Sequence, residues 1–349
     1  MTGAVMRVLL TGFHPFAHHQ TNISWQVAKS FSENVIVADP WLQQRESEIG
    51  DLDVTIDVTE LSVDLDGSKV VSELLKNGTK YDAIIHIGLA EKSLLPRIER
   101  IAKDIIDMRI EDNSGRKVVS TAISGKGDLP STIQHSYWKL ENFSNQLFFS
   151  DDAGEFLCNE TLYRTLDTIQ QLQLKDQYER ELPCFFLHLP LEENYSIVDC
   201  REIVKDCIAH MLFLPVVEVA AALIENGDSF LIAKRIEGDE FENKWEFPGG
   251  KLEPEETPLM AIEREIKEEL AIDVRAISHV GTWHHQLIDK EICLHLIKCE
   301  SENPIDVANA QNLTAHSQLA WHPTNELLEI DWIGSDKKIA QFLQRVKPE

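Results

Sequence analysis

Three glutamates in the last third of the chain have the spacing that places carboxylates together on one face of a helix. Glu265, Glu268 and Glu269 stand at positions i, i+3 and i+4, which are neighbours on a helix surface. Because their like charges repel, such a helix needs compensating positive charge. Mg²⁺ supplies it, since this ion prefers carboxylate oxygens shared with phosphate oxygens. We therefore predict a metal-binding helix. A solvated acidic helix face is the simpler interpretation, but it would not require the adjoining Arg264 or the preceding Gly-Gly pair.

The run from Gly250 to Ile272 resembles the signature of the Nudix hydrolases. That signature is Gly, five residues, Glu, seven residues, Arg-Glu, an apolar residue, any residue, Glu-Glu, any residue, Gly and an apolar residue. Every fixed position agrees except the last Gly, which is Ala271 here. The resemblance implies Mg²⁺ as the cofactor, with Mn²⁺ as an alternative. The residues to which it assigns a role are the metal ligands Glu265 and Glu269, the further ligand or base Glu268, the backbone of Gly249 and Gly250 near the metal, and Arg264, braced by Glu256, as the residue that orients the glutamates.

Flanking segments are similar to the MutT branch of that family, which acts on nucleoside triphosphates, including oxidised ones such as 8-oxo-dGTP. Val217–Arg235 resembles its opening hairpin, with Asn226-Gly227 as the turn, and Lys244–Gly250 resembles its approach to the metal helix. An Asn or Asp before the last helix often reads the base in this branch, and Asp336 falls near that place. Asp336 would accept from an exocyclic amine or, if protonated, donate; an N-cap role is the alternative. A dinucleotide or a nucleoside-diphosphate sugar is the alternative substrate.

One departure bears on the mechanism. Many members of this branch carry Glu-His shortly before a late tryptophan, here Trp321, and that Glu is a metal ligand or base; this chain has Ala315-His316 instead. Either the helix glutamates suffice, or a carboxylate from the polar loop at 300–316 substitutes. The candidates in that loop are Glu300, Glu302 and Asp306.

The composition of the whole chain excludes several kinds of partner. A length of 349 residues suggests two domains, and 43% apolar with 26% charged residues is typical of a soluble globular protein. The formal net charge of -26 argues against binding a nucleic acid polymer or a membrane surface, but not against a nucleotide held through metal. No apolar run has membrane-spanning length, no signal peptide is evident, and the six cysteines form no disulfide framework. We expect a cytoplasmic protein, and a homo-oligomer is left open.

Strands alternate with helices through the first three fifths of the chain. Apolar runs predict buried strands at 6–10, 81–88 and 184–189 and helices around 158–172 and 197–212. This order predicts an α/β fold in which a doubly wound, mostly parallel sheet has helices on both faces. Pro215 follows the last helix and a new strand opens at Val216, so we place the domains at 1–213 and 216–349. For the second domain, the Nudix resemblance implies an α/β/α sandwich with a mixed sheet.

Separated segments of the first domain resemble the pyroglutamyl peptidase I family of cysteine peptidases, also called pyrrolidone-carboxylate peptidases. They are similar to this family in motif and in order along the chain: Thr11–Phe16 with Asn22–Trp25, Gly88–Ala90 with Ile98–Ala102 and Arg109–Asn113, Ser150–Asn159, and Phe185–Pro190. The resemblance implies Cys158 as nucleophile, His188 as general base and acid, and Glu99 as the residue that holds the imidazole, with no cofactor. It also places Arg109 near the site and Phe13 and Phe16 against the flat pyrrolidone ring.

The residue types suit this chemistry, because amide hydrolysis through a covalent intermediate needs a thiolate, a base and a group that orients the base. Cys158 precedes a predicted helix, whose N-terminus we expect to lower the thiol pKa. Taken separately, a buried Cys or a His after a strand is more often structural. The family's glycine pairs are replaced by Ala17-His18 and Glu91-Lys92, so side chains stand where a small ligand would approach backbone.

Together these patterns predict a bifunctional hydrolase with two active sites. One would release N-terminal pyroglutamate from a peptide, and the other would cleave a nucleoside triphosphate to monophosphate and pyrophosphate. In the alternative, the first domain is an inactive binding or assembly module, and the altered glycine positions motivate it.

Overall fold

The structure is a computed structural model that describes residues 6–31, 34–309 and 313–346. The chain divides into two compact units, each described here by itself. The first consists of residues 1–40 and 49–214, and the second of residues 41–48 and 215–349. The chain passes from the first unit to the second after Leu214, and the inclusion of residues 41–48 in the second unit was not predicted. Among the described residues, no helix is both long and apolar enough to cross a membrane.

The first unit is built on a seven-stranded sheet of order β2-β3-β1-β4-β9-β5-β8. Its strands are β1 (Met6–Phe13), β2 (Val35–Val37), β3 (Leu52–Leu61), β4 (Ala83–Leu89), β5 (Arg97–Glu99), β8 (Phe148–Ser150) and β9 (Cys184–Leu189). The four central strands β3, β1, β4 and β9 are parallel, while β2 and β5 run antiparallel to their neighbours β3 and β9. A small separate pair joins β6 (Ile101–Ala102) to β7 (Leu129–Pro130).

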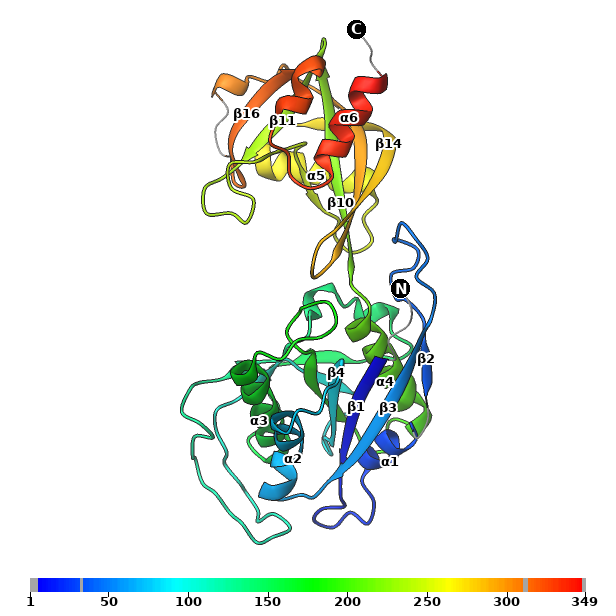
Figure 1. Ribbon diagram of the computed structural model, residues 1–349, viewed down its shortest axis with the longest axis vertical. Helices are drawn as coiled ribbons and strands as arrows, with labels where there is room; N and C mark the ends of the chain where they lie inside the picture. Colours follow the sequence, from blue (N-terminus) through cyan, green and yellow to red (C-terminus); the bar gives the residue numbers. More distant parts are fainter. Residues whose placement is uncertain (1–5, 32–33, 310–312, 347–349) are drawn as a thin grey trace. The chain divides into compact units, whose positions relative to one another are not determined.

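Helices cover both faces of this sheet, as Figure 1 shows, with α1 and α4 on one side and α2 and α3 on the other. The helices are α1 (Ile23–Lys29), α2 (Leu65–Lys76), α3 (Leu157–Leu172) and α4 (Ile197–Leu212), with short 3₁₀ turns η1 (His135–Tyr137) and η2 (Leu140–Asn142). In α3, Leu162, Leu166 and Ile169 are buried at the spacing of one helix face. The prediction of a doubly wound sheet is therefore confirmed.

The second unit is a mixed sheet between two helices. Its strands are β10 (Val216–Asn226), β11 (Ser229–Arg235), β12 (Trp245–Glu246), β13 (Gly249–Lys251), β14 (Val274–Gln286), β15 (Glu291–Ser301) and β16 (His316–Pro323). Its helices are α5 (Pro258–Leu270) and α6 (Asp336–Val346), with 3₁₀ turns η3 (Val307–Asn309) and η4 (Thr324–Glu329). The main order is β12-β11-β10-β15-β14, with β13 paired to β10 and β16 to β11. Positions 310–312 of the predicted loop lie outside the described residues.

Strand β10 shows why this unit is a sandwich. Its alternate residues Ala220, Ala222 and Ile224 belong to a core with α5, while Ala221 and Leu223 belong to a separate core with α6. Side chains alternate between the faces of a strand, so a strand that is apolar on both faces must be covered twice. The predicted α/β/α sandwich is confirmed.

One turn lies a residue later than predicted. The sequence suggested Asn226-Gly227, but Asn226 pairs with Ser229, so the two-residue loop of the hairpin is Gly227-Asp228. Gly227 has φ of 63°, a left-handed conformation that glycine adopts without a steric penalty.

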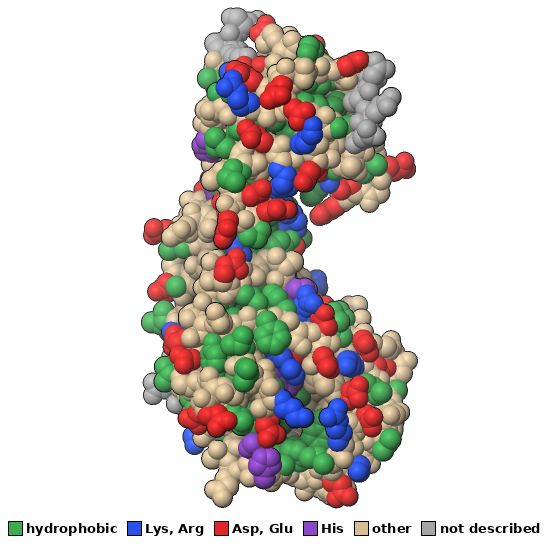
Figure 2. Space-filling view, turned by 180° about the vertical axis from the view of Figure 1, so that it is seen from behind, with side chains coloured by type: hydrophobic (Ala, Val, Ile, Leu, Met, Phe, Trp, Pro, Cys, Tyr) green, Lys and Arg blue, Asp and Glu red, His purple; other side chains and the backbone are tan. Residues whose placement is uncertain are grey.

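On the face shown in Figure 2, basic side chains are scattered among acidic ones. The part of this face that the structure describes therefore shows no extended basic surface of the kind that binds a nucleic acid backbone.

Candidate functional sites

The first candidate site lies at the carboxyl ends of β4 and β9, where Cys158 meets the sheet. Cys158 is half-buried in the first turn of α3. A Cβ built on Gly88 would lie 2.6 Å from the Phe186 ring and 3.1 Å from the Cys158 sulfur, so a side chain here would collide with the ring and crowd the thiol. Gly88 is also the register partner of His188 on the neighbouring parallel strand. Gly88 thus brings the thiol and the imidazole to the same place.

His188 is held from its other side by a buried carboxylate. Its Nδ1 lies 2.7 Å from Glu99 Oε1, and the Glu99 side chain is fully buried. Arg97 donates from Nε to the same oxygen at 2.6 Å. Arg97 was not predicted as part of this site, although Arg97 and Glu99 stand two apart on β5 and therefore share a face of the strand. The structure brings Cys158, His188 and Glu99 together in one cluster.

The expected depression of the thiol pKa is wrong for this structure. Burial raises the pKa of Cys158 to about 12, and the charge of Glu99 acts in the same direction, with Arg97 opposing. Burial also lowers the pKa of His188 below its ordinary value, although Glu99 partly opposes this. Desolvation disfavours both charged forms. A thiolate at Cys158 therefore needs a base that takes up its proton.

A cavity of about 250 Å³ opens beside the thiol. Its lining includes Phe13, Phe16, Phe156 and Cys158, and the Phe16 and Phe156 ring centroids are 5.3 Å apart. Both aromatic residues that the sequence suggested for ring binding therefore line the cavity that contains the thiol. Arg109 has an exposed side chain and adjoins Ile110, which also lines the cavity.

The second candidate site is the acidic face of α5. A Cβ on Gly250 would lie 2.4 Å from an oxygen of the Glu265 carboxylate, so Glu265 packs directly against the glycine backbone. Gly249 has no room either, since its Cβ would meet the Ala220 carbonyl oxygen at 2.0 Å. The two glycines are therefore required by the close approach of β13 to α5 and β10.

Arg264 connects the carboxylates around it. It donates to both oxygens of Glu256, at 2.8 and 2.7 Å. It also donates to Glu265 at 2.9 Å and to the exposed Glu268 at 3.2 Å. One guanidinium thus fixes three carboxylates, using the planar set of donors that suits arginine to this task.

Glu269 lies in a different environment, beside residues from β12 and β16. Its Oε2 is buried without a hydrogen bond and lies 3.6 Å from His316 Nδ1. His316 is fully buried and its Nε2 lies 2.7 Å from Glu246 Oε1. Burial raises the pKa of Glu269 to about 7, with Glu265 and Glu246 acting in the same direction and His316 opposing. An unpartnered carboxylate oxygen among neighbouring carboxylates fits a divalent cation, so the residues present suit the metal that the resemblance implied.

Glu246 and His316 were not predicted as parts of this site. Glu246 falls within the Trp-Glu-Phe-Pro motif and His316 directly follows Ala315, so both stand in segments that the sequence marked. Two of the three loop carboxylates proposed as substitutes have other partners: Glu300 accepts from Arg275 at 2.8 Å and Asp306 accepts from the Ala308 amide at 3.1 Å.

Asp336 is buried at the start of α6 and accepts a hydrogen bond from the Phe247 amide at 2.8 Å. Burial raises the pKa of this carboxyl well above its ordinary value. Asp336 thus lies next to the segment that carries Glu246.

Comparison with known proteins matches each part of the chain to a family. The family model described as pyroglutamyl peptidase matches residues 6–226, and the NUDIX domain model matches residues 215–343. The pyrrolidone-carboxylate peptidase of Thermoanaerobacter sp. is 29% identical over 213 residues, which cover 58% of this chain and 96% of the relative. That of Pyrococcus furiosus is 33% identical over 46% of this chain and 72% of the relative.

The CTP pyrophosphohydrolase of Escherichia coli is 31% identical over 35% of this chain and 87% of its own length. A solved mutant pyrrolidone carboxyl peptidase from Pyrococcus furiosus has 27% identity and a TM-score of 0.49, covering 59% of this chain and 98% of that one. The chain therefore belongs to the pyroglutamyl peptidase family and carries, at residues 215–343, a NUDIX domain.

Proposed function

We propose that the chain is a bifunctional hydrolase with an independent active site in each unit. The first unit, here called the peptidase unit, would release N-terminal pyroglutamate from peptides. The second, here called the Nudix unit, would cleave nucleoside triphosphates to monophosphate and pyrophosphate. The observation that carries the first activity is the cluster of Cys158, His188 and Glu99 beside Gly88. The observation that carries the second is the contact of Glu265 with the Gly250 backbone beside the unpartnered oxygen of Glu269.

In the peptidase unit, the sulfur of Cys158 would attack the carbonyl carbon of the pyroglutamyl residue while its proton passes to His188. The carbon–nitrogen bond then breaks, and His188 returns the proton to the leaving amine. Water next attacks the thioester, with His188 again accepting a proton, and pyroglutamate and the free thiol are released. Glu99 holds Nδ1 and stabilises the imidazolium that forms in each step. Phe13 and Phe16 pack against the flat ring of the substrate.

In the Nudix unit, Glu265 and Glu269 would hold the metal together with the backbone at Gly250, and Glu268 would be a further ligand or base. When bound, Mg²⁺ neutralises the polyphosphate and acidifies the attacking water; Mn²⁺ is the alternative ion. Arg264 keeps the glutamates in place. His316, fixed by Glu246, is a positioning residue for Glu269 and occupies the region where the missing late glutamate was expected.

Nucleoside triphosphates are the substrate class that we propose, because the flanking motifs are of the MutT type and one relative is named for CTP. Asp336 is our candidate for base recognition. It would accept from an exocyclic amine of the base or, if protonated, donate to an acceptor atom such as N3 of cytosine or O6 of an oxidised guanine. CTP and 8-oxo-dGTP are therefore the first two substrates to compare.

Product analysis tests the Nudix assignment. The purified chain with millimolar Mg²⁺ should release pyrophosphate from a nucleoside triphosphate, and Glu269→Gln should lower kcat by roughly 10²-fold or more. Glu255→Gln, which changes an exposed carboxylate of the preceding segment, should retain activity. The opposite result is release of monophosphates from a dinucleotide or a nucleoside-diphosphate sugar and no pyrophosphate from any triphosphate. That result would show that nucleoside triphosphates are not the substrate class. Full activity of Glu269→Gln would contradict the metal assignment.

A binding or assembly role is the second candidate for the peptidase unit. It is favoured by His18 and Glu91, which line the cavity where the family pattern has glycines. A fluorogenic pyroglutamyl amide separates the two: turnover that requires Cys158 supports the peptidase, whereas no turnover supports the binding role.

We place both activities in the cytoplasm, because all six cysteines are free and reduced thiols are typical of that compartment.

A further inference from the structure

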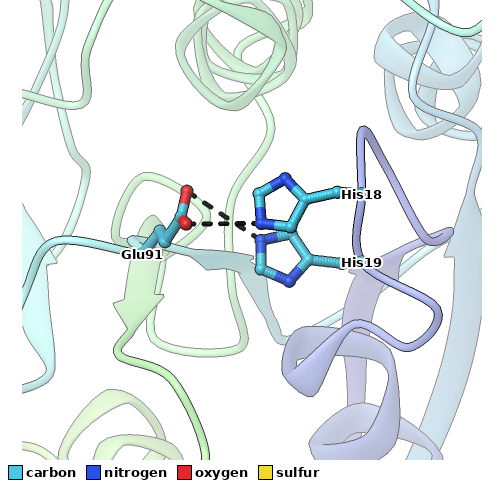
Figure 3. Close-up of side chains that lie close together, drawn as sticks. All are labelled: His18, His19 and Glu91. Carbon is cyan, nitrogen blue, oxygen red and sulfur yellow. Dashed lines mark ion pairs between the residues drawn. The ribbon is translucent and has the colours of Figure 1, made fainter.

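Two histidines and a glutamate meet at the cavity of the peptidase unit. His18 and His19 belong to the loop after β1, and Glu91 to the segment after β4. Figure 3 shows the two imidazole rings one above the other, both turned toward the Glu91 carboxylate. His18 Nε2 lies 3.6 Å from Glu91 Oε1, and His19 Nε2 lies 3.9 Å from Glu91 Oε2. All three residues line the cavity that also contains Cys158.

These separations fit ligands of one cation better than they fit hydrogen bonds. Each residue offers one ligand atom, and the three atoms lie within 4.8 Å of one another. Both nitrogen–oxygen distances exceed hydrogen-bond length. Ligand atoms around a tetrahedral zinc ion at its usual bond lengths are about 3.3 Å apart, so small side-chain rotations would bring the three atoms to that spacing. Two imidazoles with one carboxylate are a ligand set that suits Zn²⁺, whereas Mg²⁺ prefers oxygen ligands throughout.

The backbone holds both segments in place before any ion binds. The His19 amide donates to the Phe16 carbonyl at 3.2 Å, and the Ala90 amide donates to the Leu189 carbonyl at 2.7 Å. Ala17 has φ of 53°, a left-handed conformation that is unfavourable for a residue with a Cβ. This bend directs the next two residues, His18 and His19, toward Glu91.

We propose that His18, His19 and Glu91 bind a Zn²⁺ ion at the peptidase cavity. Three protein ligands leave a fourth position open to water, as in zinc sites that are not closed by protein. A hydrated ion takes up an appreciable share of a cavity of about 250 Å³, since each water accounts for about 30 Å³ of liquid volume. Bound zinc would therefore compete with the pyroglutamyl substrate. This competition rests on the proposed peptidase activity; the binding does not.

Zinc titration of the full-length Cys158→Ala variant tests the binding without any contribution from the catalytic thiol. With millimolar Mg²⁺ present to occupy the Nudix carboxylates, calorimetry with ZnCl₂ should show one tight site per chain. His19→Asn and Glu91→Gln, each added to Cys158→Ala, should weaken that site by roughly 10-fold or more. The matched control is His14→Asn, which changes a single histidine beside a single glutamate, with His14 Nε2 3.5 Å from Glu60, and it should leave zinc binding unchanged.

A second control addresses the Nudix unit, where the Cys293 sulfur lies 3.8 Å from His284 Nε2 and 3.6 Å from His295 Nε2. If Cys293→Ser removes the zinc site while Glu91→Gln retains it, the proposal is overturned, and equal affinity in all variants also overturns it. Competition is tested with the wild-type chain by comparing pyroglutamyl amide hydrolysis with and without zinc. Glu91→Gln should be less sensitive than wild type, and equal sensitivity would show that zinc acts on the thiol directly. If no hydrolysis is found at all, the peptidase proposal fails while the titration still decides the metal site.

Discussion

At the scale of single residues, Ala271 shows a local conflict between sequence and backbone. It follows the last residue of α5 with φ of 56°, and its amide donates to the Lys267 carbonyl. A left-handed conformation at a helix end usually selects glycine, and a Cβ there costs about 1 kcal/mol. We predict that Ala271→Gly raises the free energy of unfolding of the Nudix unit by about 1 kcal/mol, measured by urea denaturation. A loss of stability in this variant would show that the Ala271 methyl group contributes more by packing than the strained backbone costs.

Glu99 gives a prediction about pH. The neutral imidazole of His188 is the base, and its pKa lies below the ordinary value because of burial, while Glu99 raises it. Activity should therefore fall only as pH drops below about 6.5. In Glu99→Gln the raising interaction is lost, so this acid limb should move to lower pH, and kcat/KM should fall by roughly 10²- to 10⁴-fold. A limb that stays in place, or moves to higher pH, in a full pH–rate profile would contradict the assigned role of Glu99.

At the scale of secondary-structure elements, His316 connects β16 to α5 and β12 through Glu269 and Glu246. We predict that His316→Asn lowers kcat for nucleoside triphosphate cleavage by roughly 10- to 100-fold, as expected when a neighbour of a metal ligand is lost. Glu300→Gln is the matched control and should retain activity, because the Glu300 carboxylate is already paired with Arg275. Full activity in His316→Asn together with a loss of activity in Glu300→Gln would indicate that Glu300 substitutes for the missing glutamate.

Much of the element order could be predicted because the apolar patterns are strong. Strand β9 and helix α4 have the predicted bounds, at 184–189 and 197–212, since β9 is an apolar run and α4 is an amphipathic segment that begins after the N-cap Ser196. The turn between β10 and β11 was predicted one residue too early, because either Asn226 or Asp228 could form a two-residue turn with Gly227. Arg97 and Glu246 were missed as site residues because their roles depend on strand pairing and helix packing. The raised thiol pKa was missed because burial cannot be judged from the residues adjoining Cys158.

At the scale of the whole molecule, the sequence predicted two consecutive domains, whereas the second unit also includes residues 41–48. Arg45, from that segment, donates to Glu291 at 2.9 Å, and both side chains are buried. Glu291 also accepts from the Glu46 amide and lies 2.8 Å from His284 Nδ1. No local pattern in the sequence could indicate this pairing, because its partners are separated by more than 240 residues and depend on tertiary structure.

The central claim is that one chain contains two hydrolytic sites that work independently. The measurement that tests it most directly is the hydrolysis of a fluorogenic pyroglutamyl amide and of a nucleoside triphosphate by four full-length proteins under reducing conditions. They are the wild type, Cys158→Ala, Glu269→Gln and the control Cys293→Ser.

We predict that Cys158→Ala abolishes amide hydrolysis and retains nucleotide cleavage. Glu269→Gln should show the reverse, and Cys293→Ser should retain both activities. Amide hydrolysis that survives in Cys158→Ala, or its absence from a wild-type protein that cleaves nucleotide, would contradict the account of the peptidase unit.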